Sequence, residues 1–221
     1  MSALPHSRTP PPHSRWLGRI SYEAALELQE SLVREKIAGD PTDHLLLLEH
    51  DPVYTMGRTR DESSLGEERY LPHPVHRTNR GGQATYHGPG QLVGYPILDL
   101  NNYGRDLHLY LRFLEEVLIG VLSYYEVQGC RREGLTGVWV DDRKIASLGI
   151  GVRHWISMHG FALNVEENLP GFLSITPCGI EGVTMTSLSR EAGRNLKSRE
   201  VSEITVEIFA RKLQSLRDGS F

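Results

Sequence analysis

The stretch from 136 to 165 constrains the fold most, because it predicts consecutive β-strands joined by short connections. Its segments GVWV, KIASLGIGV and MHGFALNV alternate in the two-residue period of a strand. The residues Asp141-Asp142-Arg143 separate the first two segments and have the composition of a hairpin loop. The segment therefore predicts antiparallel hairpins within a sheet.

Other segments predict helices and further strands around this unit. The run HLLLLEH at 44–50 indicates a buried strand, and a second strand is expected at 53–57. Ser21 can cap a helix that ends near Gly39, an apolar stripe runs from Leu107 to Tyr125, and a last helix is expected over about 203–217. Since helices and hairpins are mixed without a repeat, we expect an α+β fold with a mixed β-sheet flanked by helices.

The first fifteen residues, MSALPHSRTPPPHSR, differ in composition from the rest. Pro, Ser, Arg and His without periodicity predict a disordered Pro-rich tail over 1–15. A transit peptide is an alternative, but three consecutive prolines oppose the amphipathic helix that it needs. Residues 16–221 are long enough to bury a core, so we expect them to form a single domain.

Cysteine content and charge limit the compartment and the partners. Two cysteines, Cys130 and Cys178, indicate a reducing compartment, and neither a membrane-spanning run nor a signal-peptide core is found. A net charge of −4 gives no general attraction to nucleic acid or to anionic lipid. We therefore expect a cytoplasmic protein that binds neither nucleic acid nor membrane.

The glycine-rich segment RGGQATYHGPGQLVGYPILDL, residues 80–100, is the most unusual part of the sequence. Glycines next to an apolar strand give an open backbone that a ligand can approach closely. A phosphate-binding loop is excluded because no Gly-Lys-Ser/Thr ending follows and the glycines precede a strand. Composition leaves a ligand-lining loop and an elaborate hairpin open, and leaves His87 open as a base, a ligand or a structural histidine.

Cys178 lies between Pro177 and Gly179 on a predicted turn, where little side-chain bulk covers the sulfur. That position favours a reactive thiol, although a small apolar loop residue is an equal alternative at this point. No metal site is expected, because Pro72 and Pro74 prevent a helix around the HxxH spacing of His73 and His76.

Four long motifs then agree with one family. The segments RGGQATYHGPGQLVGYPILDL, TGVWVDDRKIASLGIGV, HGFALNV and ITPCGIEGVTMTSL closely resemble, in this order, the lipoyl(octanoyl) transferases, or lipoate-protein ligase B family. The resemblance runs from about Leu17 to Leu216 without a departure at the positions that the family uses.

The resemblance implies a cytosolic acyltransferase that moves an octanoyl group from octanoyl-acyl carrier protein to a lysine of a lipoyl domain, the first step of protein lipoylation. The acceptors would be the lipoyl domains of 2-oxoacid dehydrogenase E2 subunits and the glycine cleavage H protein. It also implies a fold similar to the catalytic domains of the biotin and lipoate protein ligases, and neither cofactor nor metal. We expect a monomer.

By motif, Cys178 is similar to the family's acyl-accepting nucleophile and Lys144 to its activating partner. The implied substrate contacts are Arg80, Gly81, Gly82, Gln83, Ala84, Thr85, Tyr86, His87, Ser147, Leu148, Gly149, Gly160, Phe161 and Ala162.

These residue types suit acyl transfer. A thioester donor passes its acyl group to another thiol at almost no thermodynamic cost, and only the thiolate attacks well, so a nearby cation helps at neutral pH. Without the family, Lys144 on a hairpin would be read as a solvated charge. The tetrahedral oxyanion could be held by the N–H groups of Cys178 and Gly179, or by those of residues 147–149.

An octanoyl chain needs an apolar wall, for which we expect Gly81, Gly82, Tyr86 and residues 160–162. Burying its six methylenes would contribute about 5 kcal/mol. An arginine patch is expected to dock the acidic partner proteins of this family, drawn from Arg58, Arg60, Arg77 and Arg153.

Three other activities remain open from sequence. An ATP-dependent lipoate or biotin ligase would need no nucleophilic cysteine. A hydrolase would pair Cys178 with His87 and release free octanoate. A non-catalytic module would only bind lipoyl domains.

Overall fold

The computed structural model describes residues 10–59, 61–167 and 169–220. The strands are β1 (His13–Ile20), β2 (His44–His50), β3 (Val53–Met56), β4 (Val75–Arg77), β5 (Thr85–His87), β6 (Gln91–Ile97), β7 (Cys130–Arg132), β8 (Leu135–Val140), β9 (Arg143–Arg153), β10 (Ile156–Asn164) and β11 (Thr184–Met185). The α-helices are α1 (Tyr22–Ile37), α2 (Leu107–Tyr124), α3 (Leu188–Ala192) and α4 (Ser198–Arg217). Short 3₁₀ segments are η1 (Ser63–Leu65), η2 (Glu68–Tyr70), η3 (Leu100–Tyr103), η4 (Pro170–Ser174) and η5 (Pro177–Gly179).

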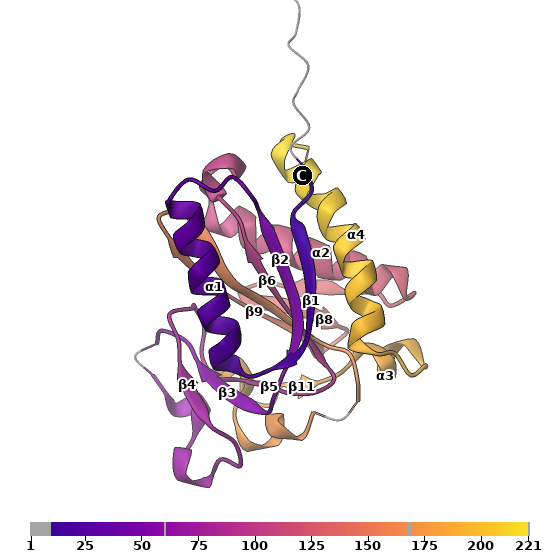
Figure 1. Cartoon of the computed structure of the whole chain (residues 1–221). Coiled ribbons are helices and arrows are strands. Elements are labelled where there is room, and N and C mark those ends of the chain that lie inside the picture. Colours follow the sequence, from indigo (N-terminus) through magenta and orange to yellow (C-terminus); the bar gives the residue numbers. More distant parts are fainter. Residues whose placement is uncertain (1–9, 60, 168, 221) are drawn as a thin grey trace, which may run out of the picture.

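The main sheet has the strand order β1-β2-β6-β10-β9-β8-β7, with β11 added beside β9 (Figure 1). Strands β1 and β2 are parallel, as are β11 and β9, whereas the other neighbours are antiparallel. A second, small sheet of order β4-β3-β5 lies at one end of the main sheet (Figure 1). The predicted α+β class with a mixed, helix-flanked sheet is confirmed.

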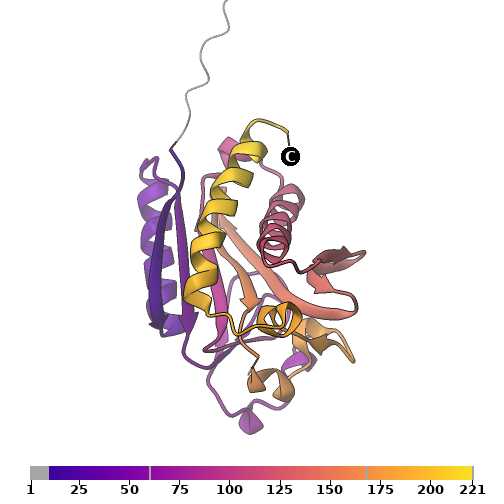
Figure 2. The ribbon, with the colours of Figure 1, turned by 90° about the vertical axis from the view of Figure 1, so that its right-hand side faces the viewer.

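Helices cover both faces of the main sheet, with α1 on one side and α2 and α4 on the other (Figure 2). Strand β2 shows why its sequence is continuously apolar. Leu46 and Leu48 pack in the cluster under α1, whereas Leu45 and Leu47 pack in the cluster under α2 and α4. Because successive side chains of a strand point to opposite faces, a strand buried on both faces needs apolar residues at every position.

The helix and hairpin predictions are confirmed with small shifts. Ser21 caps α1, since its hydroxyl accepts the N–H of Ala24 at 3.2 Å. The β8–β9 turn contains Asp141 and Asp142, while Arg143 is already the first residue of β9. Helix α4 begins at Ser198 rather than near 203.

The boundary predicted for the tail is wrong at its C-terminal end. Residues 13–15 belong to β1, where His13 pairs with His44 of β2. The segment forms a strand because β2 offers it a free edge for backbone hydrogen bonds, which its composition does not reveal. Residues 1–9 of the predicted tail lie outside the described residues. In the described ranges, no helix is long and apolar enough to cross a membrane.

Candidate active site

A cavity of about 290 Å³ lies where the main sheet meets the small sheet and the η5 turn. Strands β9 and β10 form one wall, and the chain from Arg80 to His87 together with Cys178 forms the other. Most of the predicted site residues line it, namely Arg80, Gly82, Gln83, Thr85, His87, Lys144, Ser147, Leu148, Gly149, Gly160, Phe161, Ala162 and Cys178. Segments nearly one hundred residues apart in sequence therefore meet at one site.

Cys178 is held in a left-handed turn. Its φ and ψ are 57° and 19°, a region that non-glycine residues rarely adopt, and Gly179 follows with φ 68°. The Cys178 N–H donates to the carbonyl of Ala84 at 2.8 Å, which ties the turn to the glycine-rich segment. The half-buried thiol lines the cavity, with its Sγ 3.6 Å from the Ser147 hydroxyl.

Lys144 reaches the same cavity from the main sheet. Its side chain is 1% exposed, and its Nζ donates to the carbonyl of Thr136 at 3.2 Å and lies 5.4 Å from the Trp139 ring centroid. Gly137 makes this path possible, since a Cβ there would lie 2.8 Å from the Lys144 Cε. The alternative of a solvated hairpin charge is wrong: Lys144 is a buried ammonium without a carboxylate within 4 Å among the described residues.

Glu115 of α2 supports the strand under Lys144. Its buried carboxylate accepts the N–H of Gly137 at 3.2 Å and forms ion pairs with Arg112 and Arg131 at 2.7 and 3.0 Å. These ion pairs and the hydrogen bond to Gly137 fix β8 against α2.

His87 is part of a chain of oriented hydrogen bonds. The amide nitrogen of Gln91 donates to Asn164 and to the Tyr86 carbonyl, so its oxygen must accept from the His87 Nδ1, at 2.7 Å. The His87 Nε2 then accepts from the Thr55 hydroxyl at 3.2 Å. Burial lowers the pKa of His87 to about 3. A neutral ring with both nitrogens engaged does not act as a base toward Cys178.

Two further buried histidines lie at the cavity or next to it. Burial lowers the pKa of His159 to about 3 and that of His50 to about 4. His159 has a φ of 56°, and its N–H leaves the sheet ladder to donate to the Gln29 side chain at 2.8 Å. Both rings are uncharged at neutral pH, which leaves the positive charge of the cavity to Arg80 and Lys144.

The structure removes one of the two predicted oxyanion sites. The N–H groups of Cys178 and Gly179 are already bonded, to the carbonyls of Ala84 and Thr176 at 2.8 and 2.9 Å. A bonded donor is unavailable to a developing oxyanion without breaking the turn. Residues 147–149 of β9 pair with residues 160–162 of β10, so of the other predicted site only N–H groups that face away from β10 remain available.

Three predicted contact residues lie outside the cavity lining. The Gly81 N–H donates to the Ile150 carbonyl, and Ala84 contributes its carbonyl to Cys178. The Tyr86 ring packs with Tyr54 and Phe172 under the small sheet, so its predicted place in the acyl wall is wrong. The alternation of β5 explains this, because Thr85 and His87 face the cavity and their neighbours face away.

Several lining residues carry no recognisable signal in the sequence. These are Tyr22, Thr55, Tyr95, Gly134, Leu135, Thr136, His159 and Ile180. The Tyr22 hydroxyl is buried without a hydrogen-bond partner among the described residues, as is the Thr85 hydroxyl. The cavity therefore has polar atoms at its α1 end beside the apolar side chains of Leu135, Leu148 and Phe161.

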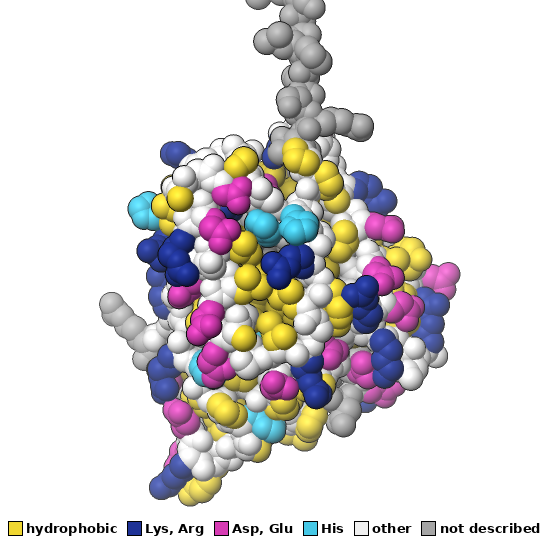
Figure 3. Space-filling view, viewed as in Figure 1, with side chains coloured by type: hydrophobic (Ala, Val, Ile, Leu, Met, Phe, Trp, Pro, Cys, Tyr) yellow, Lys and Arg dark blue, Asp and Glu magenta, His cyan; other side chains and the backbone are white. Residues whose placement is uncertain are grey.

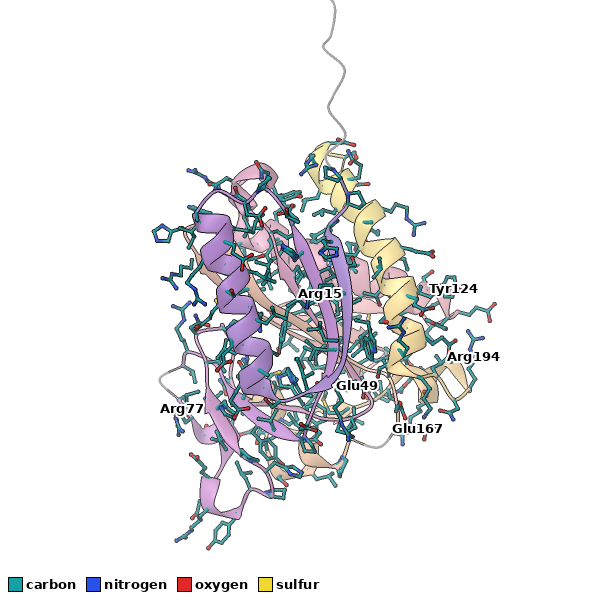
Figure 4. The ribbon with its side chains drawn as sticks, viewed as in Figure 1. Arg15, Glu49, Arg77, Tyr124, Glu167 and Arg194 are labelled. Carbon is teal, nitrogen blue, oxygen red and sulfur yellow. The ribbon has the colours of Figure 1, made fainter. Side chains whose placement is uncertain are left out.

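The arginine patch predicted for docking is weakened at Arg77. This residue points outward from β4 (Figure 4), and ion pairs with Glu62 and Glu68 at 2.8 and 3.2 Å neutralise it. Charges of both signs are interspersed over the face in Figure 3. Arg60 lies outside the described residues. No metal-binding group of three or more His, Cys, Asp and Glu side chains occurs within the described ranges.

A half-buried thiol and a buried lysine side chain face one cavity on a helix-flanked mixed sheet. Residues 21–210 match the family model described as the lipoyl protein ligase A/B catalytic domain. The chain belongs to this family.

Among similar proteins is an octanoyltransferase of Geotalea uraniireducens, 49% identical over 92% of this chain and 95% of that protein. Another octanoyltransferase, of Geobacter sulfurreducens, is 50% identical over 88% of this chain and 81% of that protein.

Two solved structures show the same fold at low identity. A bipartite lipoate protein ligase from Thermoplasma acidophilum aligns with a TM-score of 0.70 at 16% identity, covering 92% of this chain and 84% of that one. The biotin protein ligase of Aquifex aeolicus aligns with a TM-score of 0.52 at 15% identity, covering 94% and 71%.

Proposed function

We propose that the chain is an octanoyltransferase that moves an octanoyl group from octanoyl-acyl carrier protein to Cys178 and then to a lysine of a lipoyl domain. The acceptors are the lipoyl domains of 2-oxoacid dehydrogenase E2 subunits and the glycine cleavage H protein. The observation that carries the proposal is the meeting of Cys178 and Lys144 at one partly apolar cavity. The octanoyltransferases with about half of their residues identical support the acyl group.

In the first step, the Cys178 thiolate attacks the carbonyl carbon of the donor thioester. A carbon–sulfur bond to Cys178 forms, the bond to the carrier thiol breaks, and the carrier leaves as a thiolate that takes the proton of the Lys144 ammonium, which leaves Lys144 neutral for the second step. One thioester replaces another, so no ATP is consumed. The Lys144 ammonium stabilises the attacking sulfur through its charge.

In the second step, the acceptor lysine amine attacks the octanoyl-Cys178 carbonyl. An amide bond forms, and the Cys178 sulfur leaves. The amine loses a proton to Lys144, which acts in its neutral form, and the departing sulfur returns to the thiolate. We assign the oxyanion to backbone N–H groups of residues 147–149 that face away from β10, because the amides of Cys178 and Gly179 are already bonded.

The acyl chain lies against the apolar side chains of the cavity, contributed mainly by the main sheet. These are Leu135, Leu148, Phe161, Ala162 and Ile180. Gly160 allows β10 to lie close to β6 here, since a Cβ there would lie 2.3 Å from the Gly94 carbonyl oxygen. Full burial of six methylenes contributes about 5 kcal/mol.

The rival activities have less support. Solved structures with this fold include a lipoate-protein ligase A bound with ATP. Its sequence identity to this chain is low, so the likeness concerns the fold alone. A hydrolase that pairs Cys178 with His87 conflicts with the engaged ring nitrogens of His87. We also propose that the chain from His13 onward acts as one catalytic domain of a cytoplasmic monomer. Size-exclusion chromatography with light scattering tests the monomeric state.

Intact mass spectrometry tests the proposed function. Mixed with octanoyl-acyl carrier protein, the protein should gain one octanoyl group, and addition of a lipoyl domain should transfer that group to the domain. Cys178→Ser should remove the adduct, whereas Cys130→Ser, at an exposed position on β7, should keep it. Release of free octanoate without an acceptor would favour the hydrolase, and octanoate-dependent pyrophosphate release would favour the ATP-dependent ligase.

A further inference from the structure

The Arg80 guanidinium is buried at the cavity and has no carboxylate partner. The residue is 8% exposed, and no Asp or Glu of the described residues lies within 4 Å of its nitrogens. Its hydrogen bonds go to neutral oxygens only: to the Thr55 carbonyl and hydroxyl at 2.7 and 2.8 Å, to the Gln83 carbonyl at 3.0 Å and to the Gly81 carbonyl at 2.9 Å. A buried cation is costly unless negative charge faces it at some stage.

Glycines form the slot that holds this side chain. A Cβ at Gly57 would lie 2.8 Å from the Arg80 Nη1, and one at Gly149 would lie 3.0 Å from its Cδ. The backbone therefore closes around the arginine on two sides, from the end of β3 and from β9. The slot fixes the position of the guanidinium charge more closely than that of a lysine ammonium on its flexible side chain.

The slot lies next to the Cys178 turn. Arg80 holds the carbonyl of Gln83, and the carbonyl of the next residue, Ala84, holds the N–H of Cys178. The Gln83 side chain in turn occupies the space beside Gly179, where a Cβ would lie 2.1 Å from its oxygen. Burial lowers the pKa of the Arg80 guanidinium, and the negative charge of a Cys178 thiolate is the strongest influence that raises it.

We propose that Arg80 is a positioning residue that supplies a second positive charge to the Cys178 thiolate, in addition to that of Lys144, rather than a contact for the octanoyl chain. The inference rests on the proposed function only in that Cys178 is the nucleophile. Since electrostatic stabilisation is reciprocal, the thiolate that stabilises the buried guanidinium is itself stabilised by it. In the described lining, the Cys178 thiol, Tyr22 and Tyr95 are the groups that can become an anion beside Arg80.

The histidines and tyrosines of this site do not titrate between pH 6 and 10, the range of the test below. Burial holds the pKa of His87 and His159 at about 3, and burial raises that of Tyr22 to about 12 and that of Tyr95 well above its usual value. Lys144 faces the cavity from β9 and is present in every variant below.

The test is the rate of Cys178 alkylation by iodoacetamide from pH 6 to 10, measured by mass spectrometry. All proteins carry Cys130→Ser, so that one thiol reacts. Arg80→Ala should react about tenfold more slowly at pH 7, because the thiolate fraction falls as the midpoint of the profile rises by about one pH unit. Above the midpoint, the rates should converge. Arg211→Ala removes an exposed arginine of α4 and should follow the parent profile.

Rescue separates the charge from the packing. Millimolar guanidinium ion should enter the slot of Arg80→Ala and restore alkylation at pH 7, whereas urea, which is similar in shape and neutral, should not. Arg80→Lys keeps the charge and should retain most of the parent rate at pH 7 even if its melting temperature falls. Arg80→Lys therefore tests the proposal even if Arg80→Ala does not fold.

Equal loss of rate at all pH values in Arg80→Lys and Arg80→Ala, or equal rescue by urea, would show that Arg80 is only a structural clamp. A parent profile in a folded Arg80→Ala protein would overturn the proposal as well. These outcomes are independent of acyl transfer. A protein that forms no octanoyl adduct can still show the arginine effect, and a protein without the effect can still form the adduct.

Discussion

The two walls of the cavity are built in different ways. Lys144 comes from β9 of the main sheet, where pairing with Trp139 next to a β-bulge, the Glu115 contacts of β8 and a glycine beside its side chain fix it in a buried position. Cys178 comes from a short turn outside the sheet, in a left-handed conformation and half-buried.

This difference matches what the two groups have to do. In the proposed mechanism, Lys144 supplies positive charge and then accepts a proton at a fixed place, so a rigid strand is a suitable support. Two large protein partners are proposed to reach the thiol in turn, for which a half-buried position on a loop is suitable. We therefore expect the lysine side to be the fixed element and the cysteine side to be the point of contact with substrates.

The largest expected effect tests the lysine side. Lys144→Arg keeps a cation but cannot lose its proton near neutral pH, so it should form the octanoyl adduct and transfer the group to the lipoyl domain about 10²–10⁴-fold more slowly. Lys144→Ala should impair both steps. Single-turnover measurements of adduct formation and of transfer separate them. Parent rates for transfer in Lys144→Arg would limit the role of this residue to charge alone.

The next effect tests the histidines behind the cysteine side. Burial lowers the pKa of His87 to about 3, whereas an unfolded histidine has a pKa of about 6.5. Below pH 6.5, the unfolded state therefore takes up a proton that the folded His87 ring does not. The stability from its neutral form is complete above that pH and is lost as the pH falls. At pH 5, the loss is about 2 kcal/mol for one such histidine.

Urea unfolding at pH 7 and pH 5 checks this prediction. His87→Asn should show a smaller loss between the two pH values than the parent protein, by about 2 kcal/mol. His108→Asn, on the exposed side of α2, is the matched control and should keep the parent pH dependence. Identical pH dependence in all three proteins would place the acid-sensitive groups elsewhere.

A third effect concerns the apolar side chains, most of which come from the lysine side. A hexanoyl donor lacks two methylenes of the octanoyl chain, which should cost about 1.6 kcal/mol, or about tenfold in kcat/KM. Competition between hexanoyl and octanoyl carrier proteins measures the ratio directly. Equal rates would mean that the chain stays in water rather than along Leu148 and Phe161.

The smallest expected effect concerns a side-chain contact between the two cavity walls. Ser147 of β9 lies 3.6 Å from the Cys178 sulfur. Loss of one such hydrogen bond in Ser147→Ala should cost about 1 kcal/mol, or about fivefold in adduct formation, with little change in thermal stability. Ser157→Ala is a poor control because Ser157 is buried in the sheet, so Ser123→Ala on the exposed surface of α2 serves instead.

The sequence predicted the lysine side better than its surroundings. Strands β8, β9 and β10 and the hairpin turn at Asp141 follow from alternation and turn chemistry, which are local signals. The next hairpin loop is less readable, because His154 and Trp155 both adopt positive φ without the Asn or Gly that such a turn favours. The parallel pairing of β1 is long-range and leaves no trace in its composition.

For the site, the motifs identified the residues but not the directions in which their side chains point. Thr85 and Tyr86 are equal members of one motif, yet the strand turns one into the cavity and the other into the small-sheet core. Tyr22 and Thr55 line the cavity through tertiary contacts alone. The paired burial of Arg80 and Lys144 without carboxylates also required the fold, because sequence spacing does not show which charges are left without a partner.

The conformation of Cys178 has a consequence for selection. A residue at φ 57° is strained unless it is glycine, and its neighbour Gly179 already shows what this turn favours. Cys178→Gly should therefore melt at a higher temperature than Cys178→Ala while both are inactive. Under the proposed function, the residue that carries the chemistry holds a conformation that glycine adopts with less strain, so folding and activity make opposing demands on this position.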